Sequence, residues 1–300
     1  MASRAPTGSG SLPVSRRSLA AGLLAATLAG VAAPAVAQVP PSGCRILLTN
    51  DDGVNAPGIL AAYRQLSTVC ETVISAPATD QSGASHAIIN TRGGTTVRRI
   101  VLAGGVPAYA VEGSPAEAVA IGLHAFGAER QFDLVISGVN RGENLGLGNL
   151  YSGTVNAAME AVLRGTPSIA VSQAGAYGGD YERGARFART LAALALRRPL
   201  PAGTMLNVNI PHGRIRGIRV VRAGLLSTVL RGFDAVPAGP GVTVYTPRIS
   251  RRERAPEAGD VRDYLAGYVT IVPLALDRTA AREIPALGRW ASELRAPGND

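Results

Sequence analysis

The chain has 300 residues, enough for one large domain with an appendage, and it carries a formal net charge of +9. All 30 basic residues are arginines scattered along the chain, and aromatic residues make up only 4% of it. This pattern argues against binding to duplex nucleic acid and favours small anionic partners. After residue 37, no stretch of the sequence is apolar for long enough to anchor the chain in a membrane.

Residues 1–37 have the layout of an export signal. Arg16 and Arg17 precede a modest Ala-, Gly- and Leu-rich run over residues 20–33, and residues 35–37 read Ala-Val-Ala, an A-x-A cleavage site. The general secretory signal shares this layout, but the paired arginines and the weakly apolar run favour the twin-arginine route. We therefore expect an exported, periplasmic protein.

From residue 45 onward, short apolar runs alternate with segments of helical spacing. Strands are predicted at 45–50, 71–77, 95–102, 107–113, 132–140 and 167–173, and helices at 56–69, 114–127 and 152–165. Ser114 and Pro115 are typical of the first positions of a helix. The alternation predicts an α/β fold of the Rossmann-like, doubly wound type, with a mainly parallel sheet.

The composition changes after the predicted core, which we place at residues 38–225. Residues 226–270 are rich in Gly, Pro and Arg with isolated strand-like pieces, and we interpret them as an extended, protruding C-terminal β-hairpin arm. Residues 271–300 are expected to pack on the core or on a partner subunit. In a doubly wound sheet, ligands bind at the carboxyl ends of the strands, so the polar loops that follow the strands should gather at one edge.

Two adjacent carboxylates, Asp51 and Asp52, follow the first predicted strand, and the chain then turns through Gly53. Successive strand residues point to opposite faces, so the two side chains converge only if the strand has already ended. Converging carboxylates require a cation. With oxygen ligands and no nearby His or Cys, we expect Mg²⁺, Mn²⁺ or Ca²⁺ rather than Zn²⁺. The alternative is that Asp51 is a helix N-cap or an ordinary turn residue and that Asp52 is solvated.

A second polar stretch covers residues 137–161, between a buried strand and a helix. Asn140 is placed to offer an amide oxygen to the same cation. The glycine-rich loop that follows allows the backbone to pass close to a ligand, and the helix opened by Ser152, Gly153 and Thr154 offers N–H groups that suit a phosphate. Neither a P-loop nor a proper dinucleotide-binding fingerprint is present, and a glycine-rich loop before a helix is often structural.

The motifs together resemble those of the SurE family, the survival protein E nucleotidases. They read ILLTNDDGVNAPGI, SAPATDQSGAS, SGVNRGENLG, YSGTVNAAMEA, PSIAVS, LNVNIP and GYVTIVPL, in order over most of residues 45–275. The resemblance implies a metal-dependent phosphomonoesterase that hydrolyses nucleoside 5′- and 3′-monophosphates to nucleoside and phosphate. It also implies a homodimer or homotetramer.

The family's metal ligands fall on Asp51, Asp52, Ser82 and Asn140 in this sequence, with Asp51 and Asp52 also as the catalytic pair and Mg²⁺ or Mn²⁺ as the cofactor. Its substrate contacts fall on Asn144, Ser152, Gly153 and Thr154. The sequence departs from the family pattern at residues 78–81, where basic and Asn residues are common, and at residues 113–118. The first of these departures affects the expected base or leaving-group contacts.

Other readings of the polar residues remain open. His86, close to Ser82, is either structural or a substrate contact, whereas His124 and His212 are expected to be structural or at the surface. An aspartyl-phosphate mechanism usually requires D-x-D, which the adjacent pair lacks. The alternative functions are an exported nucleotide- or phosphate-binding protein without turnover, and an acid phosphatase or exopolyphosphatase of broad specificity.

The only two cysteines, Cys44 and Cys70, each immediately precede a predicted strand. These strands should be neighbours in a doubly wound sheet, about 4.8 Å apart, which a disulfide tolerates. Because an exported protein enters an oxidising compartment, we predict a disulfide between them. The alternative is two unrelated buried thiols.

Overall fold

The computed structural model describes residues 43–90, 92–175, 180–225, 228–251 and 258–294; the predicted export signal lies outside these ranges. Nine strands of the described chain form one mixed sheet. They are β1 (Arg45–Thr49), β2 (Glu71–Pro77), β3 (Val97–Leu102), β4 (Val106–Val111), β5 (Leu134–Arg141), β6 (Ser168–Gln173), β7 (Thr204–Ile210), β8 (Gly217–Val220) and β11 (Tyr268–Ala275).

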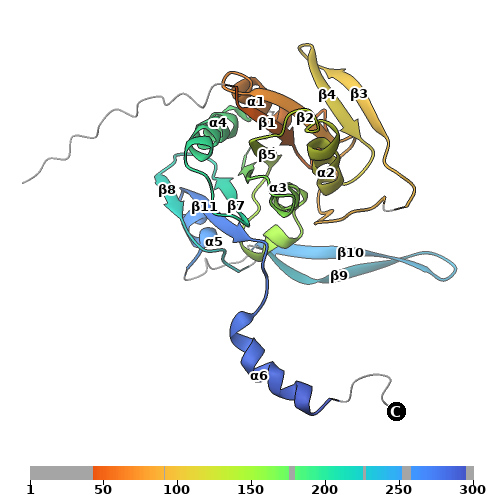
Figure 1. Cartoon of the computed structure of the whole chain (residues 1–300). Coiled ribbons are helices and arrows are strands. Elements are labelled where there is room, and N and C mark those ends of the chain that lie inside the picture. The colour runs from red at the N-terminus through yellow and green to blue at the C-terminus, as the bar shows by residue number, and fades with distance from the viewer. Residues whose placement is uncertain (1–42, 91, 176–179, 226–227, 252–257, 295–300) are drawn as a thin grey trace, which may run out of the picture. The chain divides into compact units, whose positions relative to one another are not determined.

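The strand order is β3-β4-β2-β1-β5-β6-β7-β11-β8 (Figure 1). Every neighbouring pair from β4 to β7 is parallel, whereas β3 is antiparallel to β4, and β11 is antiparallel to β7. This confirms the predicted α/β fold with a mainly parallel sheet. The chain moves outward from β1 to β2 on one side and later adds β5 on the other, so the order reverses between β1 and β5, where such sheets bind ligands.

Two pairs of helices cover opposite faces of this sheet (Figure 1). Helices α1 (Pro57–Leu66) and α4 (Glu182–Arg197) pack together, as do α2 (Pro115–Ala125) and α3 (Gly153–Leu163). The apolar run of β1 serves both sides, because Ile46 and Leu48 join the core under α1 and α4, while Leu47 joins the core under α2 and α3. A strand buried on both faces reads as a continuous apolar run, as this one does.

The predicted start of α2 is confirmed in detail. The Ser114 side chain accepts a hydrogen bond from the N–H of Glu117 at 3.1 Å, and the Glu117 carboxylate accepts the N–H of Ser114 at 2.8 Å. Pro115 occupies the first helical position. This reciprocal capping satisfies two N–H groups that a helix start otherwise leaves unpaired.

The hairpin is shorter than the predicted arm. Strands β9 (Thr228–Gly239) and β10 (Val242–Arg251) form a separate antiparallel pair, and almost all of their described side chains are exposed. The assignment of residues 260–270 to the arm is wrong, since α5 (Asp260–Leu265) is largely buried and β11 inserts between β7 and β8. The apolar, β-branched residues of its sequence identify β11 as a strand, but pairing with the distant β7 decides which sheet it joins.

The C-terminal segment predicted at residues 271–300 would begin within β11, so its predicted boundary falls inside a strand of the main sheet. It continues through the short helices η2 (Ala281–Glu283), α6 (Ile284–Gly288) and η3 (Arg289–Ser292). Apolar side chains remain exposed on this segment, at Ile284, Leu287, Trp290 and Leu294. Within the described ranges, we find no helix with the length and apolar character needed to cross a membrane.

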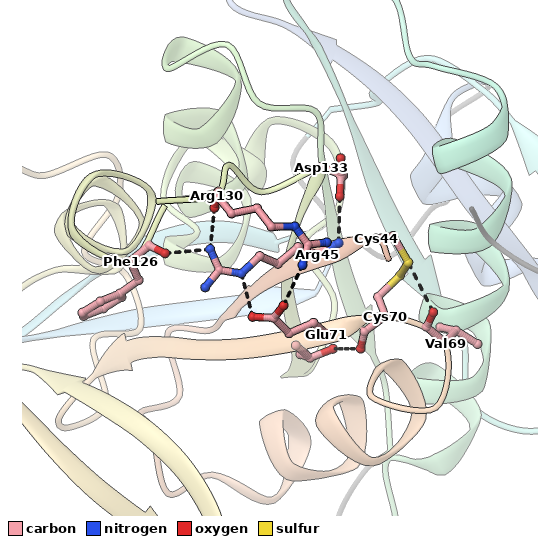
Figure 2. Close-up of polar contacts among 9 residues, drawn as sticks. Cys44, Arg45, Val69, Cys70, Glu71, Phe126, Arg130 and Asp133 are labelled. Atoms are coloured by element: carbon pink, nitrogen blue, oxygen red, sulfur yellow. Dashed lines mark hydrogen bonds and ion pairs between the residues drawn. A yellow bond between two sulfur atoms is a disulfide. The ribbon is translucent and has the colours of Figure 1, made fainter. Parts of the chain in front are cut away.

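The predicted disulfide between Cys44 and Cys70 is confirmed, with a Cα–Cα distance of 5.0 Å (Figure 2). The next residue on each strand adds an ion pair, because Arg45 Nε lies 2.7 Å from Glu71 Oε1. The Arg45 guanidinium also donates to the carbonyl oxygen of Phe126 at 2.7 Å. The amino ends of β1 and β2 are therefore joined both covalently and by charge.

Candidate active site

Asp51 lies two residues beyond the end of β1, where it is 3% exposed. Thr154 Oγ1, in the first turn of α3, donates to Asp51 Oδ1 at 2.5 Å. A Cβ at Gly153 would lie 2.7 Å from the Asp51 Cβ, so glycine is needed for this helix to approach so closely. Asp51 does not cap a helix, because Ala56 is the N-cap of α1; the capping alternative is therefore wrong.

Asp52 contacts the end of β5. The N–H of Arg141 donates to Asp52 Oδ2 at 3.1 Å, so the strand that carries Asn140 ends against the carboxylate pair. Asn140 is 7% exposed, and its side-chain amide donates to the Gly142 carbonyl oxygen at 3.1 Å. That contact leaves the side-chain oxygen of Asn140 as the group available to a cation.

The surroundings of Asp51 and Asp52 disfavour the ionised forms of their carboxyl groups. Burial raises the pKa of Asp51 to about 6 against the hydrogen bond from Thr154, and the charge of Asp52 adds to the rise. Burial also raises the pKa of Asp52, with the Arg141 N–H acting in the opposite direction. A cation beside both groups would favour their charged forms, so this environment fits a metal.

The proposed metal ligands would all bind a cation through oxygen atoms. In the described ranges, no group of three or more His, Cys, Asp and Glu side chains is arranged to hold a metal. The proposed ligands are instead two carboxylates, one amide and one hydroxyl, which suit Mg²⁺ or Mn²⁺ better than Zn²⁺.

Ser82 lies in the loop after β2, beside the turn of Asp51. The neighbouring residue Gln81 donates its N–H to the Asp51 carbonyl oxygen at 2.8 Å, which fixes the loop against this turn. Ser82 itself is exposed and bonds Asp80, whose pKa its hydroxyl and N–H hold below the ordinary value. The loop that carries Ser82 thus lies beside the turn of Asp51, and the role of Ser82 as a metal ligand stays a prediction.

Ser152 and Thr154 have structural partners at the start of α3. The Ser152 side chain caps the helix by accepting the Val155 N–H at 3.1 Å, and Thr154 bonds Asp51. The sequence had suggested phosphate contacts for both. In the structure these side chains join the helix start to the carboxylate pair, and their contact with substrate stays a prediction, as does that of Gly153.

Asn144 is held by a buried network that the sequence analysis did not single out. Its N–H donates to Asn209 Oδ1 at 2.7 Å, and its carbonyl oxygen accepts Asn207 Nδ2 at 2.8 Å. Its side-chain amide donates to Ser172 Oγ at 2.9 Å. Ser172, Asn207 and Asn209 are all 0% exposed. The available signal was a pair of asparagines two positions apart in an otherwise apolar strand, which places both on one face.

His86 also has a defined partner. Its Nε2 lies 2.7 Å from Glu160 Oε2, and Arg164 Nε lies 2.6 Å from the other carboxylate oxygen. Burial opposes ionisation of Glu160, yet the hydrogen bonds from His86 and Arg164 hold its pKa below the ordinary value. Glu160 is therefore an ion-pair residue, and His86 has a structural contact. His124 and His212 lie at the surface, which was one of the predicted outcomes.

Comparison with known proteins agrees with this architecture. The family model described as Survival protein SurE matches residues 46–228. The chain belongs to the SurE family. A crystal structure of a SurE protein from Aquifex aeolicus superposes with a TM-score of 0.72 at 33% identity, covering 82% of this chain and 99% of that one. The fold is therefore the SurE fold, with its separate hairpin.

Two curated SurE relatives illustrate the similarity in sequence. The protein named 5′-nucleotidase SurE from Moorella thermoacetica is 39% identical over 241 residues, which is 78% of this chain and 91% of that protein. The one from Syntrophotalea carbinolica is 40% identical over 258 residues, which is 82% of this chain and 97% of that protein. The match spans nearly the whole length of both relatives, and the chain is an enzyme of this nucleotidase family.

Proposed function

We propose that this protein is a metal-dependent phosphomonoesterase that hydrolyses nucleoside 5′-monophosphates, and also 3′-monophosphates, to nucleoside and phosphate. The observation that supports this most directly is the carboxylate pair, with Asp51 buried and Asp52 partly buried, at the point where the strand order reverses between β1 and β5. The names of the relatives supply the substrate class.

Asp51, Asp52, Asn140 and Ser82 are the residues that would hold Mg²⁺ or Mn²⁺. A cation bound there would neutralise charge that develops on the phosphate and lower the pKa of a water that attacks phosphorus. Thr154 orients Asp51 through a hydrogen bond, and the Arg141 N–H orients Asp52.

The substrate side of the site is the glycine-rich loop that runs from Gly142 to Tyr151. Its first part is fixed by Asn207 and Asn209 through Asn144, so the loop is organised before substrate arrives. Asn144, Ser152, Gly153 and Thr154 are the proposed contacts for the phosphate. Preorganised amides of this kind are worth more than mobile ones, because they need no reorganisation during the reaction.

The decisive experiment measures release of phosphate from 5′-AMP and 3′-AMP by the metal-free protein, with and without added Mn²⁺ or Mg²⁺. Hydrolysis of both nucleotides that requires the metal and stops with EDTA is expected. Binding of AMP without release of phosphate would support the alternative of a binding protein. Faster release from polyphosphate than from either nucleotide would support an exopolyphosphatase.

We also propose that the protein is exported by the twin-arginine route to the periplasm. The support is the sequence of residues 1–37, with Arg16 and Arg17 directly before the apolar run. The precursor with both arginines replaced by lysine should accumulate in the cytoplasm when the two compartments are fractionated. Unchanged export of this double variant would point to the general secretory route.

A homodimer or homotetramer is the proposed assembly. Large apolar side chains are exposed on the hairpin, at Phe233, Val244 and Tyr245, and on the last described segment, at Leu287 and Trp290. Exposed apolar surface of this kind is typical of contacts between subunits. Light scattering coupled to gel filtration should give two or four times the mass of the mature chain, and a monomeric mass would refute the assembly.

A further inference from the structure

A buried carboxylate outside the predicted site, Asp260, joins three segments that are far apart in the sequence. It is the first residue of α5 and is 0% exposed. Its Oδ2 accepts the N–H of Gly146 at 2.8 Å, and its Oδ1 accepts the N–H of Gly224 at 2.7 Å. Gly224 lies just before β9 and Asp260 follows β10. One side chain therefore ties the glycine-rich loop to the two segments that flank the hairpin in the sequence.

The packing at Gly146 supports this tether. Its φ is +54°, and a Cβ built there would lie 1.9 Å from the Leu225 carbonyl oxygen, so only glycine fits. The loop is therefore pressed against the chain that leads into β9. Leu145, the preceding residue, is buried beside Val261 and Tyr264 of α5. Apolar packing and the carboxylate thus fix the same point of the loop.

The tethered loop connects the two halves of the proposed site. It begins after Asn140 and ends at Ser152, the cap of α3. Near its end, the carbonyl oxygens of Leu150 and Tyr151 accept hydrogen bonds from Ser85, in the loop that also carries Ser82. A shift at Gly146 would therefore move the middle of this loop, where substrate is expected to bind.

We propose that Asp260 is a positioning residue that holds the glycine-rich loop against the two segments that flank the hairpin in the sequence, so that substrate affinity depends on this tether. The identity of the substrate rests on the proposed function. Asp260 lies beyond residues 46–228, the stretch that the family model matches.

The test is Asp260→Asn, which keeps the shape of the side chain but replaces one acceptor oxygen with a donor. One of the two tethers, to Gly146 or to Gly224, is then lost. We expect the KM for 5′-AMP to rise about tenfold, with kcat changed by less than about threefold, since the loop binds substrate and the carboxylate pair is untouched. The affinity for Mn²⁺ should remain unchanged. Hydrogen exchange of the amides in residues 142–151 should become faster.

The matched control is Asp263→Asn. Asp263 lies on the same helix, is 1% exposed and pairs with Arg219 and Arg262 rather than with the loop. This variant should lose stability without a change in KM or in exchange of residues 142–151. The proposal is overturned if the two variants change KM and loop exchange alike. It is also overturned if Asp260→Asn leaves either quantity unchanged.

The proposed function and this inference fail separately. A wild-type protein that releases no phosphate from 5′-AMP would refute the function. The tether would then be judged by loop exchange and by the Kd for 5′-AMP in the presence of Mn²⁺, with the same comparison between the two variants.

Discussion

At the scale of single residues, two of the four proposed metal ligands carry the negative charge of the proposed site. Asp51 and Asp52 supply both carboxylates of the proposed metal site, and the other two ligands are neutral. Burial is the largest cause of the raised pKa values of both groups, so a cation bound beside them would compensate for the hydration that they lose. Removal of either charge should therefore affect function far more than folding.

Asp52→Asn is expected to lower the turnover of 5′-AMP by about three orders of magnitude, because it removes ligand charge from the transition state. The melting temperature should change little, as Asp52 is only partly buried and contributes no core packing. Steady-state kinetics over a range of Mn²⁺ concentrations would measure the effect. Asp133→Asn, which alters a carboxylate bonded to the Arg45 N–H at the opposite edge of the sheet, is the control and should retain full activity. Near-normal turnover by Asp52→Asn would exclude it as a ligand.

Glu160 should make stability depend on pH in the acidic range. Its folded-state pKa lies below the ordinary value because of His86 and Arg164, so its stabilising contribution is present above the unfolded-state pKa. That contribution is lost as the pH falls through the lower folded-state pKa. Glu160→Gln should therefore lower the free energy of unfolding by about 2 kcal/mol at pH 7.

The difference in the free energy of unfolding between wild type and Glu160→Gln should narrow as the pH falls through the lowered folded-state pKa of Glu160. Urea unfolding from pH 3 to pH 7 would measure it. A difference of constant size across this range would show that the charge of Glu160 is not what stabilises the fold.

At the scale of elements, the start of α3 acts as a support for the carboxylate pair. The helix is capped by Ser152, and it bonds Asp51 through Thr154. Its close approach to Asp51, in the turn that follows β1, is possible because position 153 has no side chain. The same helix also carries Glu160, whose carboxylate pairs with His86 in the loop after β2. A disturbance of this helix start should therefore reach Asp51 directly.

Gly153→Ala tests this contact. The added Cβ would lie 2.7 Å from the Asp51 Cβ and 2.9 Å from its Oδ2, so the carboxylate or the helix must shift. Overpacking of this kind destabilises by about 1–3 kcal/mol, and we expect at least a tenfold loss of affinity for Mn²⁺. Calorimetric titration and thermal unfolding would measure the two effects. Gly93→Ala, at a glycine with no atom within 4 Å of the new Cβ, is the matched control.

At the scale of the whole molecule, the edge of the sheet that contributes a disulfide to stability lies opposite the edge that carries the proposed metal site. The disulfide and the Arg45–Glu71 ion pair lie at the amino ends of β1 and β2 (Figure 2). The carboxylate pair and Asn140 lie at the carboxyl ends of β1 and β5. Parallel strands have this polarity throughout, so each edge can be altered with little effect on the other.

Reduction of the disulfide should lower the melting temperature while metal-dependent turnover is retained. Closure of a loop with a sequence separation of 26 contributes about 3 kcal/mol in the chain-entropy model. The ion pair between Arg45 and Glu71 and the paired strands keep the reduced protein in register. The variant with Cys44 and Cys70 both replaced by serine should behave like the reduced protein. Loss of turnover on reduction would show that the two edges are coupled.

The sequence by itself determined the parts of this protein that local patterns encode. Alternation of apolar runs with helical spacing predicted the α/β core, because burial of strands on both faces requires continuous apolar runs. Ser114 predicted the cap of α2, and Cys44 and Cys70 predicted the disulfide, because each cysteine had a fixed position before a strand. Asp51 and Asp52 marked the proposed site, because both directly follow a predicted strand.

Only the tertiary structure decided what depends on pairing between distant segments. The sequence analysis divided residues 267–274 between the hairpin arm and the C-terminal segment, whereas β11 joins the main sheet because β7 and β8 flank it. Thr154 was expected at the phosphate, yet it bonds Asp51 because α3 packs against the end of β1. Asp260 gave no signal in the sequence, since its role arises only where three remote stretches of backbone meet. Local propensity acts over a few residues, whereas these contacts span about 40 to 115 positions and form only when the sheet is complete.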